Sequence, residues 1–443
     1  MWLLPGPPEP GGNTVIVILV DTLRRDALGC YGNPDPVSPH IDALAEEGVQ
    51  FEHAVSTSGW TLPAIASLLS GTWPTLHGAS GKGVILTPIR DELPTAAEVF
   101  KREGYRTFAV ANAAFVSPML GLDRGFEVFD HKYAYNWDIR RADASVDAAL
   151  AWLRETGSQS SFVFIHLFDP HVNYDPPPGY ATKFTQGRNT PPVPLSHGAC
   201  VALAGQGGKA PPTPEDIAYV QNVYHGEVNF VDAQIGRLMR ALKDMGRYEQ
   251  STIVITADHG EEFWEHGGFE HGHTLYDELI AIPLVVKLPV SVRPAEQRVG
   301  AQVRIVDIMP TLFDLSGVNA PATFLGESLV PYFNGEAHDD LVAFSESTLY
   351  GDDKLSWRTE RYKYVVDVNP SARQRGELYD WRADPGEHNN LVETEPALAK
   401  ELDAQLTTFF NEISGKSRSM SQPEPKDLNP QIIESLESLG YLR

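Results

Sequence analysis

The sequence predicts an α/β protein in which helices cover both faces of a mostly parallel sheet, followed by a small α+β domain. Short β-branched apolar runs alternate with amphipathic helical patterns over most of the 443 residues. These runs are continuously apolar, as is typical of strands that are buried on both faces. Beyond about residue 335 the pattern changes to shorter runs. We therefore expect an extension at 1–12, a main domain at 13–335 and a C-terminal subdomain at 336–443 that includes a terminal tail.

The main domain opens with the run NTVIVILV at 13–20, which predicts a central strand ending at Asp21. Residues 39–48 predict a short amphipathic helix, and Thr61–Ser70 predicts a second helix with Pro63 in its tolerated first turn. Further strands are expected at 106–110, 161–168, 251–256, 282–288 and 303–306, and helices at 146–155 and at 215–245, the latter as one helix or two.

Residues 176–214 break the alternation, because they are rich in Pro and Gly and have little periodicity. A loop of this length is usually functional or disordered. Two interpretations stay open, a lid over a site and a mobile surface excursion.

In the subdomain, strands are expected at 341–345, 362–368 and 377–380, and a helix at 397–413. The polar, Pro-containing residues 415–430 predict a flexible tether, and 432–439 predict a closing helix.

The formal charge of −24 comes from 59 acidic and 35 basic residues, which argues against a nucleic-acid partner. No apolar stretch approaches the roughly 20 residues of a transmembrane segment. The first residues contain no intact signal peptide, so we expect a periplasmic or exported protein if the N-terminus is trimmed and a cytoplasmic one otherwise. The sequence gives no prediction of oligomeric state. Cys30 is expected to be buried and Cys200 to lie in a polar loop.

Two acidic residues follow apolar strands directly, Asp21 after VIVILV and Asp258 after TIVITA, and His259 comes next. In a sheet of this kind, ligands bind beyond the carboxyl ends of the strands. Because unpaired buried carboxylates are costly, a shared divalent cation is the favoured explanation. Zn²⁺ or Mn²⁺ suits two Asp and one His best, with Ca²⁺ or Mg²⁺ as further options. For Asp21 alone, an N-cap of a following helix is the alternative.

Histidines gather in DHGEEFWEHGGFEHGH, which contains His259, His266, His271 and His273. Such a segment is either a metal- and anion-binding loop or a solvated His-rich loop. Upstream, FIHLFDPHVNY holds two more histidines. His166 lies inside the apolar run and is interpreted as a core histidine, whereas His171 lies past the strand end, where it could contact an anion.

Thr61 stands at the start of its predicted helix, where backbone N–H groups favour a developing anion. A threonine hydroxyl beside a metal can be deprotonated into a nucleophile. The alternative is an ordinary helix N-cap, and this residue alone favours the cap.

Taken together, these segments resemble the sulfatase family of the alkaline phosphatase superfamily. The resemblance covers nearly the whole chain and rests on segments in order: VILVDTLRRDALGCYG, SPHIDALAEEGVQFEHA, WTLPAIASLLSG, GLDRGFEVFD, FIHLFDPHVNY, EVNFVDAQIGRLMRAL, VITADHGEEFWEHG, HGHTLYDELIAIPLVV, VDIMPTLFDLSG, RTERYKYV, ELYDWRADPGEHNNL and LESLGYL.

The resemblance implies an α/β/α sandwich with a small antiparallel C-terminal sheet, and a metal-dependent hydrolase of small anionic esters. It implies that Asp21, Asp258 and His259 bind the metal beside Thr61, which is itself a ligand and the nucleophile. It also implies that His171 and His271 contact the anionic group of the substrate, or hold a second metal as in two-metal relatives.

The departures from the family pattern are informative. Sulfatases have Cys or Ser in a C/S-x-P-x-R signature where this chain has Thr61-Leu62-Pro63-Ala64-Ile65, so no formylglycine is expected. Thr22 replaces the second Asp of an Asp-Asp pair, and His259 replaces the Asn of an Asp-Asn pair. The Gly-Lys-Trp-x-x-Gly segment is absent, and VANAAF with Asn112 is found near that point. His271 stands in place of a Lys.

These departures bring the pattern nearer to the phosphodiesterases, phosphonate monoester hydrolases and phosphoethanolamine transferases of the superfamily. Asn112 and His273 join His171 and His271 as candidate substrate contacts. We therefore expect phosphodiester- or phosphonate-type hydrolysis, or phosphoryl transfer, through Thr61. A sulfate-ester hydrolase without formylglycine and a catalytically silent binding protein are the two alternatives.

Overall fold

The structure is a computed structural model that describes residues 12–134, 138–185, 195–203, 212–336, 338–369 and 376–442. Within them, a large sheet has the strand order β12-β2-β11-β8-β1-β7-β5-β6. Its strands are β1 (Thr14–Val20), β2 (Val49–Val55), β5 (Arg106–Asn112), β6 (Val128–Lys132), β7 (Ser161–Leu167), β8 (Ser251–Thr256), β11 (Ala281–Lys287) and β12 (Arg298–Arg304). Only β11 runs antiparallel to its neighbours among these strands, which confirms the mostly parallel sheet.

Strand β1 lies between β7 and β8 because every one of its seven residues is apolar or small enough to be buried. Leu19 pairs with His166 of β7 on one side and with Thr256 of β8 on the other. The residues that follow β1 and β8 therefore emerge next to each other at the carboxyl edge of the sheet.

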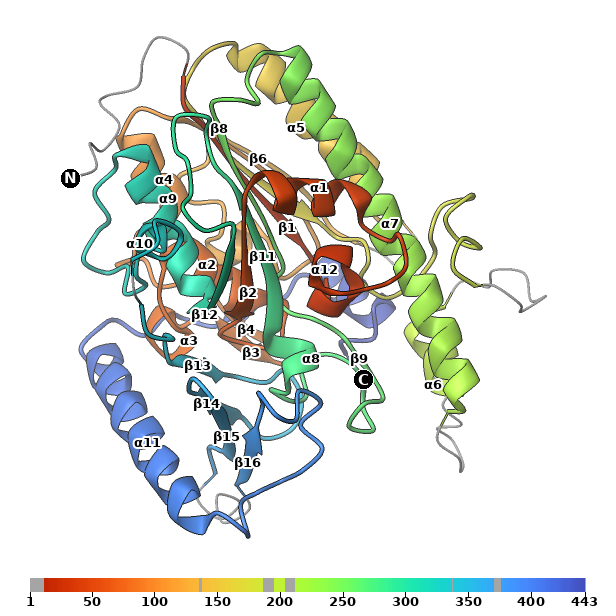
Figure 1. Ribbon diagram of the computed structural model, residues 1–443, viewed down its shortest axis with the longest axis vertical. Coiled ribbons are helices and arrows are strands. Elements are labelled where there is room, and N and C mark those ends of the chain that lie inside the picture. The colour runs from red at the N-terminus through yellow and green to blue at the C-terminus, as the bar shows by residue number, and fades with distance from the viewer. Residues whose placement is uncertain are drawn as a thin grey trace.

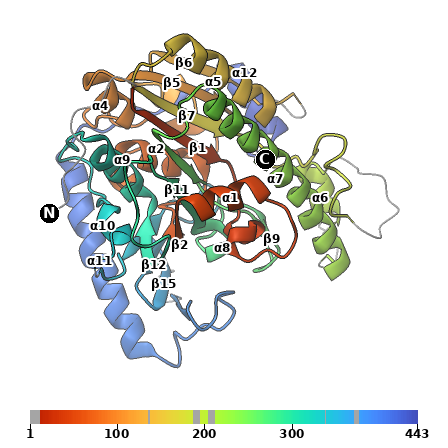
Figure 2. The same ribbon diagram turned by 45° about the horizontal axis from the view of Figure 1, so that its top comes forward.

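Helices cover both faces of this sheet (Figures 1 and 2). One layer contains α1 (Pro39–Glu47), α5 (Ala142–Thr156) and α7 (Pro214–Asp244), and α7 contacts both of the others. The other contains α2 (Thr61–Ser70), α4 (Ala96–Arg102) and α9 (Ile308–Ser316). The shorter helices are η1 (Arg25–Ala27), η2 (Gly29–Tyr31), α3 (Pro74–His77), η3 (Pro118–Leu120), α6 (His197–Leu203), α8 (Asp277–Ile280), η4 (Ile305–Asp307) and α10 (Val330–Phe333).

A second sheet follows the main one, as predicted. It is antiparallel and consists of β13 (Ala343–Glu346), β14 (Lys354–Arg358), β15 (Tyr362–Asp367) and β16 (Glu377–Asp380). Helix α11 (Pro396–Arg418) packs on it through Phe409, which contacts Trp357 of β14 and Trp73 beside α3. The same aromatic cluster thus joins the small sheet to the main domain.

A buried ionic cluster also joins the two sheets. Asp277 of α8 accepts hydrogen bonds from Arg358 and Lys363, each at 2.9 Å, and Lys363 also pairs with Glu387. Burial opposes ionisation of Asp277, but the two cations hold its pKa well below its usual range. The small sheet is therefore fixed against the segment that carries the histidine-rich loop.

The predicted tether at 415–430 is wrong. Helix α11 extends to Arg418, and β17 (Lys426–Asp427) pairs with β4 (Ile85–Thr87), which in turn pairs with β3 (Ser80–Lys82). The guanidinium of Arg90 donates to Ser417 Oγ at 2.9 Å. Ser417 and Ser421 of this segment thus have partners in the main domain, and α12 (Pro430–Ser438) follows.

Other sequence predictions need smaller corrections. Cys200 is buried in α6 and does not lie in a polar loop. The strand predicted at 303–306 is the end of β12, which begins earlier, at Arg298, and ends at Arg304, where η4 follows. Residues 186–194 and 204–211 of the proposed lid at 176–214, and residues 1–11, lie outside the described residues. Among the helices described, none is both long and apolar enough to cross a bilayer. The sequence also did not predict β2, β9 (Glu262–Phe263) or the partner of β9, β10 (Phe269–Glu270).

Candidate active site

Asp21, Asp258 and His259 meet at the carboxyl edge of the main sheet. Asp21 directly follows β1, and its backbone N–H donates to the Leu167 carbonyl of the neighbouring strand at 2.9 Å. Asp258 and His259 come just after β8. One potential ligand atom from each of the three side chains lies within 4.8 Å of the others. The sequence prediction of a cluster at two neighbouring strand ends therefore agrees with the structure.

The chemistry of this cluster fits a divalent cation. His259 Nε2 lies 3.3 Å from Asp258 Oδ2 and 3.7 Å from Asp21 Oδ1. Both carboxylate oxygens are buried and have no hydrogen-bond partner. Burial, and then the Asp258 carboxylate, raise the pKa of Asp21 well above its usual range. Two unpaired buried carboxylate oxygens and an imidazole nitrogen form an oxygen- and nitrogen-rich set that a Zn²⁺ or Mn²⁺ ion would satisfy.

Hydrogen bonds fix the orientation of the imidazole. His259 Nδ1 lies 2.8 Å from the Gly260 carbonyl, to which it must donate, so Nε2 presents a lone pair to the cluster. Such a partner on the second ring nitrogen is usual for histidines that bind metals.

His166 supports the cluster from the next strand. The Asn112 backbone N–H donates to His166 Nδ1 at 3.2 Å, so His166 Nε2 carries the proton and donates to Asp21 Oδ2 at 3.1 Å. Burial lowers the pKa of His166 to about 4, so the ring is neutral at neutral pH. The sequence suggested only a core histidine here. In the sheet, His166 pairs with Leu19, which stands two residues before Asp21. Knowledge of this strand pairing would have revealed the contact.

Thr61 is the first residue of α2, and its hydroxyl Oγ1 lies 3.3 Å from His259 Nε2. The N-cap position belongs to Trp60, and no side chain caps this helix. Thr61 is therefore not an N-cap, and its hydroxyl instead faces the acidic cluster.

His171 and His271 lie beside the cluster. The His271 ring centroid is 4.4 Å from that of His259 and 5.0 Å from that of His171. His171 Nδ1 donates to the Val172 carbonyl at 2.5 Å, and His271 Nδ1 donates to Glu261 Oε1 at 2.8 Å. Burial, reinforced by neighbouring imidazoles, lowers the pKa of both rings well below the usual range.

Sequence reasoning did not single out Tyr441, whose hydroxyl contacts the Nε2 atoms of both His171 and His271. The tyrosine lies in the LGYL segment just after α12. Its 270-residue separation from His171 left no local signal of the contact.

Asn112 and His273 lie outside the cluster. The side-chain amide of Asn112 donates to the His166 carbonyl at 2.7 Å, while its Oδ1 is buried without a partner. His273 Nε2 pairs with Glu262 Oε2 at 2.6 Å. Burial opposes protonation of His273, but Glu262 raises its pKa. Their roles as substrate contacts stay predictions.

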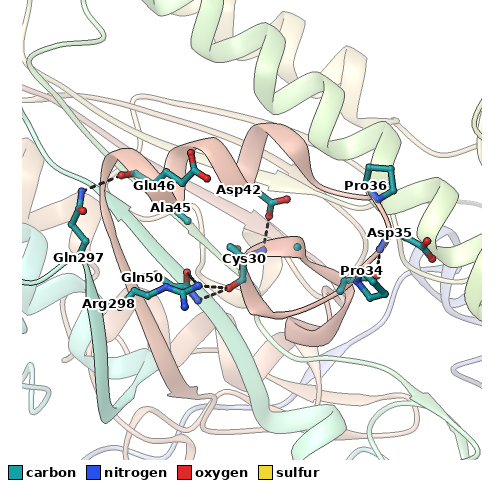
Figure 3. Close-up of a pocket in the computed structure, with 12 residues that line it drawn as sticks. Cys30, Pro34, Asp35, Pro36, Asp42, Ala45, Glu46, Gln50, Gln297 and Arg298 are labelled. Atoms are coloured by element: carbon teal, nitrogen blue, oxygen red, sulfur yellow. Dashed lines mark hydrogen bonds between the residues drawn. The ribbon is translucent and has the colours of Figure 1, made fainter.

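A surface hollow of about 700 Å³ lies elsewhere, between η2, α1 and the beginnings of β2 and β12 (Figure 3). Asp42 and Cys30 line it, and the pKa of the Cys30 thiol is raised to about 12 by burial and then by Asp42. A thiol held in its neutral form is a poor nucleophile. None of the predicted site residues lines this hollow.

The geometry agrees with what the comparisons with known proteins show. A family model described as Sulfatase matches residues 13–318, more than half of the chain. The chain belongs to the sulfatase family. A second model, described as the C-terminal part of N-sulphoglucosamine sulphohydrolase, matches residues 264–414. This sulfatase-family protein is accordingly a hydrolase, and proteins of the family depend on a divalent metal, for which Asp21, Asp258 and His259 form a fitting site.

Relatives of this sulfatase-family hydrolase align with more than nine tenths of the chain. An ulvan-active sulfatase of Formosa agariphila is 27% identical over 448 residues, and the alignment covers 93% of this chain and 83% of the relative. The uncharacterized sulfatase YidJ of Escherichia coli is 25% identical over 471 residues, with 94% and 91% covered. Among solved structures, the phosphonate monoester hydrolase of Agrobacterium radiobacter superposes with a TM-score of 0.74 at 20% identity, covering 94% of this chain and all of that one. The last likeness shows that the fold is shared.

Proposed function

We propose that this hydrolase cleaves small phosphodiester or phosphonate monoester substrates, with Thr61 as the nucleophile and a Zn²⁺ or Mn²⁺ ion held by Asp21, Asp258 and His259. The observation that carries the proposal is the 3.3 Å distance between Thr61 Oγ1 and His259 Nε2, beside two carboxylate oxygens that have no partner. A divalent cation bound there would lower the pKa of the threonine hydroxyl and neutralise a non-bridging oxygen of the substrate.

The charges at the site favour a substrate that carries one negative charge. Two carboxylates offset a divalent cation, and burial keeps His171 and His271 neutral. In the described part of the chain, no lysine or arginine forms an ion pair with Asp21 or Asp258. A dianionic phosphate monoester would bring a second, uncompensated charge into a buried site. Phosphodiesters and phosphonate monoesters carry only one.

The reaction follows from these positions. Thr61 Oγ1 forms a bond to phosphorus while the bond to the leaving oxygen breaks. The proton of the threonine hydroxyl is transferred by way of His171 or His271 to the leaving oxygen, which departs as an alcohol. Water then hydrolyses the phosphothreonine ester and restores the hydroxyl. An acceptor alcohol in place of water would make the same step a transfer.

An isosteric replacement of Thr61 tests the nucleophile. Thr61→Val keeps the shape but loses the hydroxyl, so kcat/KM should fall at least about 10³-fold, whereas Thr61→Ser should keep substantial activity. Thr72→Val is a matched control, because Thr72 is also buried and its hydroxyl has no partner. All variants should bind metal as the wild type does. Activity of Thr61→Val at the wild-type level would refute the assignment.

A second candidate, favoured by the sulfatases among the relatives, is hydrolysis of sulfate monoesters without formylglycine. A sulfate monoester also carries a single negative charge. Protein loaded with Zn²⁺ or Mn²⁺ should be assayed on an aryl sulfate, a diaryl phosphate, an aryl phosphonate and an aryl phosphate with the same leaving group. The proposal predicts the highest kcat/KM for the diester or the phosphonate, and a highest value for the sulfate would select the second candidate.

A further inference from the structure

The hydroxyl of Tyr441 lies between His171 and His271, the two histidines beside the cluster of Asp21, Asp258 and His259. It lies 3.1 Å from His271 Nε2 and within hydrogen-bond distance of His171 Nε2. The side chain is 7% exposed, and its ring packs edge-on against Phe115 with centroids 4.8 Å apart.

The protonation of the two histidine rings shows that the Tyr441 hydroxyl is a hydrogen-bond donor. His171 and His271 both give their Nδ1 protons to other partners, the Val172 carbonyl and Glu261, so both Nε2 atoms are acceptors. Two acceptors therefore compete for the single proton of the Tyr441 hydroxyl. One of the two Nε2 atoms therefore receives no hydrogen bond from Tyr441 at any moment. The Tyr441 hydroxyl can rotate toward another acceptor at little cost in free energy.

The segment that carries Tyr441 is anchored independently of the site. Strand β17 pairs with β4, and the Ser435 hydroxyl of α12 donates to the Ala134 carbonyl. Ile432, Leu436 and Leu439 of this segment are buried. Gly440 has a φ of +84°, and a β-carbon there would come within 3.0 Å of the His197 ring. These contacts anchor the tyrosine through residues that lie outside the histidine cluster.

We propose that Tyr441 is a catalytic residue of this site, whose hydroxyl turns from His171 to donate a hydrogen bond to an oxygen of the bound ester. The inference rests on the proposed function, because it assigns a third donor group to the same reaction. No covalent bond to the tyrosine is formed, and the phenol keeps its proton.

Tyr441→Phe removes only the hydroxyl and keeps the packing against Phe115. We expect kcat/KM for a diaryl phosphate or an aryl phosphonate to fall about 10- to 100-fold, the usual effect of losing a hydrogen bond to a charged group. Metal content and melting temperature should stay those of the wild type. Tyr105→Phe is the matched control. Tyr105 stands just before β5, at the opposite edge of the sheet, and its hydroxyl accepts a hydrogen bond from Asn13, so its loss should leave activity unchanged.

A second measurement separates this inference from the proposed function. Binding of inorganic phosphate to the metal-loaded protein needs no turnover and can be followed by calorimetry in slightly acidic buffer, where phosphate is mainly a monoanion. Tyr441→Phe should weaken it about 10-fold or more. An inactive wild type would refute the proposed function alone, since the phosphate titration would still test the tyrosine. If Tyr441→Phe has the activity and phosphate affinity of the wild type, the inference is overturned. A gain in activity, as expected if the tyrosine only blocks access to the site, would overturn it as well.

Discussion

Replacing Asp21 by asparagine should stabilise the metal-free protein and at the same time abolish its stabilisation by metal. In the structure Asp21 Oδ1 is buried without a partner, near the equally unpaired Oδ2 of Asp258. An asparagine keeps an acceptor for the proton of His166 and places an amide where the second carboxylate oxygen was. The change therefore removes a buried carboxyl group whose ionisation is opposed by burial and by Asp258, without removing volume.

The magnitude follows from two opposing effects. A buried polar group without a partner costs about 1–3 kcal/mol, more when it is charged, so the metal-free variant should gain roughly that amount. Unfolding entropy of about 2.1 cal/mol/K per residue converts about 2 kcal/mol in a chain of 443 residues to a melting shift of about 2 °C. With metal at 1,000 times its Kd, the wild type gains about 4 kcal/mol and the variant gains little, so the order of stability reverses.

Thermal and denaturant unfolding in a chelator and in excess Zn²⁺ or Mn²⁺ would measure both effects. Asp307→Asn is a suitable control, because the carboxylate of Asp307 is equally buried but is bonded to Arg304 and to the Glu327 backbone. That variant should lose stability in both conditions. An Asp21→Asn protein that is less stable than the wild type in chelator, or equally stabilised by metal, would refute the reasoning.

Two further predictions concern groups around the site and in the small sheet. His166→Phe removes the donor to Asp21 and should weaken metal binding about 10- to 100-fold in a chelator competition. His166→Gln should retain much of the affinity. Metal affinity equal to that of the wild type in the Phe variant would contradict the supporting role. Burial raises the pKa of Glu346 from 4.5 to about 7, so the folded protein retains a proton that the unfolded chain releases between these values. The free energy of unfolding should therefore fall by about 3 kcal/mol as pH rises from 4.5 through 7, and Glu346→Gln should abolish that fall while matching the wild type near pH 4.5. Parallel pH slopes of stability in the two proteins would exclude this assignment.

The sequence predicted those parts of the fold and site that depend on local pattern. Asp21 and Asp258 could be placed together because each follows a continuous apolar run, and parallel strands end at one edge. Thr61 could not be separated from a helix cap by local pattern, since a cap and a nucleophile occupy nearly the same position before a helix. The structure separates them, because Trp60 occupies the cap. His166 is buried in the core as predicted, but burial alone does not tell which polar group lies across the neighbouring strand.

Long-range contacts were beyond the sequence. The tether prediction failed because polar composition does not reveal that β4 offers a free edge to β17 or that Arg90 binds Ser417. Tyr441 was missed in the same way. Its motif contributed to the resemblance, but only the three-dimensional structure places its hydroxyl between two histidines.

The separation of Tyr441 from the rest of the site has a consequence for biosynthesis. The tyrosine comes 170 residues after His271, so at roughly 5–20 residues per second the ribosome needs roughly 10–30 s to produce it once the histidine-rich loop has been made. During that interval Asp21, Asp258 and His259 have all been synthesised, but the segment that closes the site has not. Metal ions have their widest access to the ligands then, so the metal supply of the compartment during synthesis, and not only the final affinity, would influence which ion becomes enclosed.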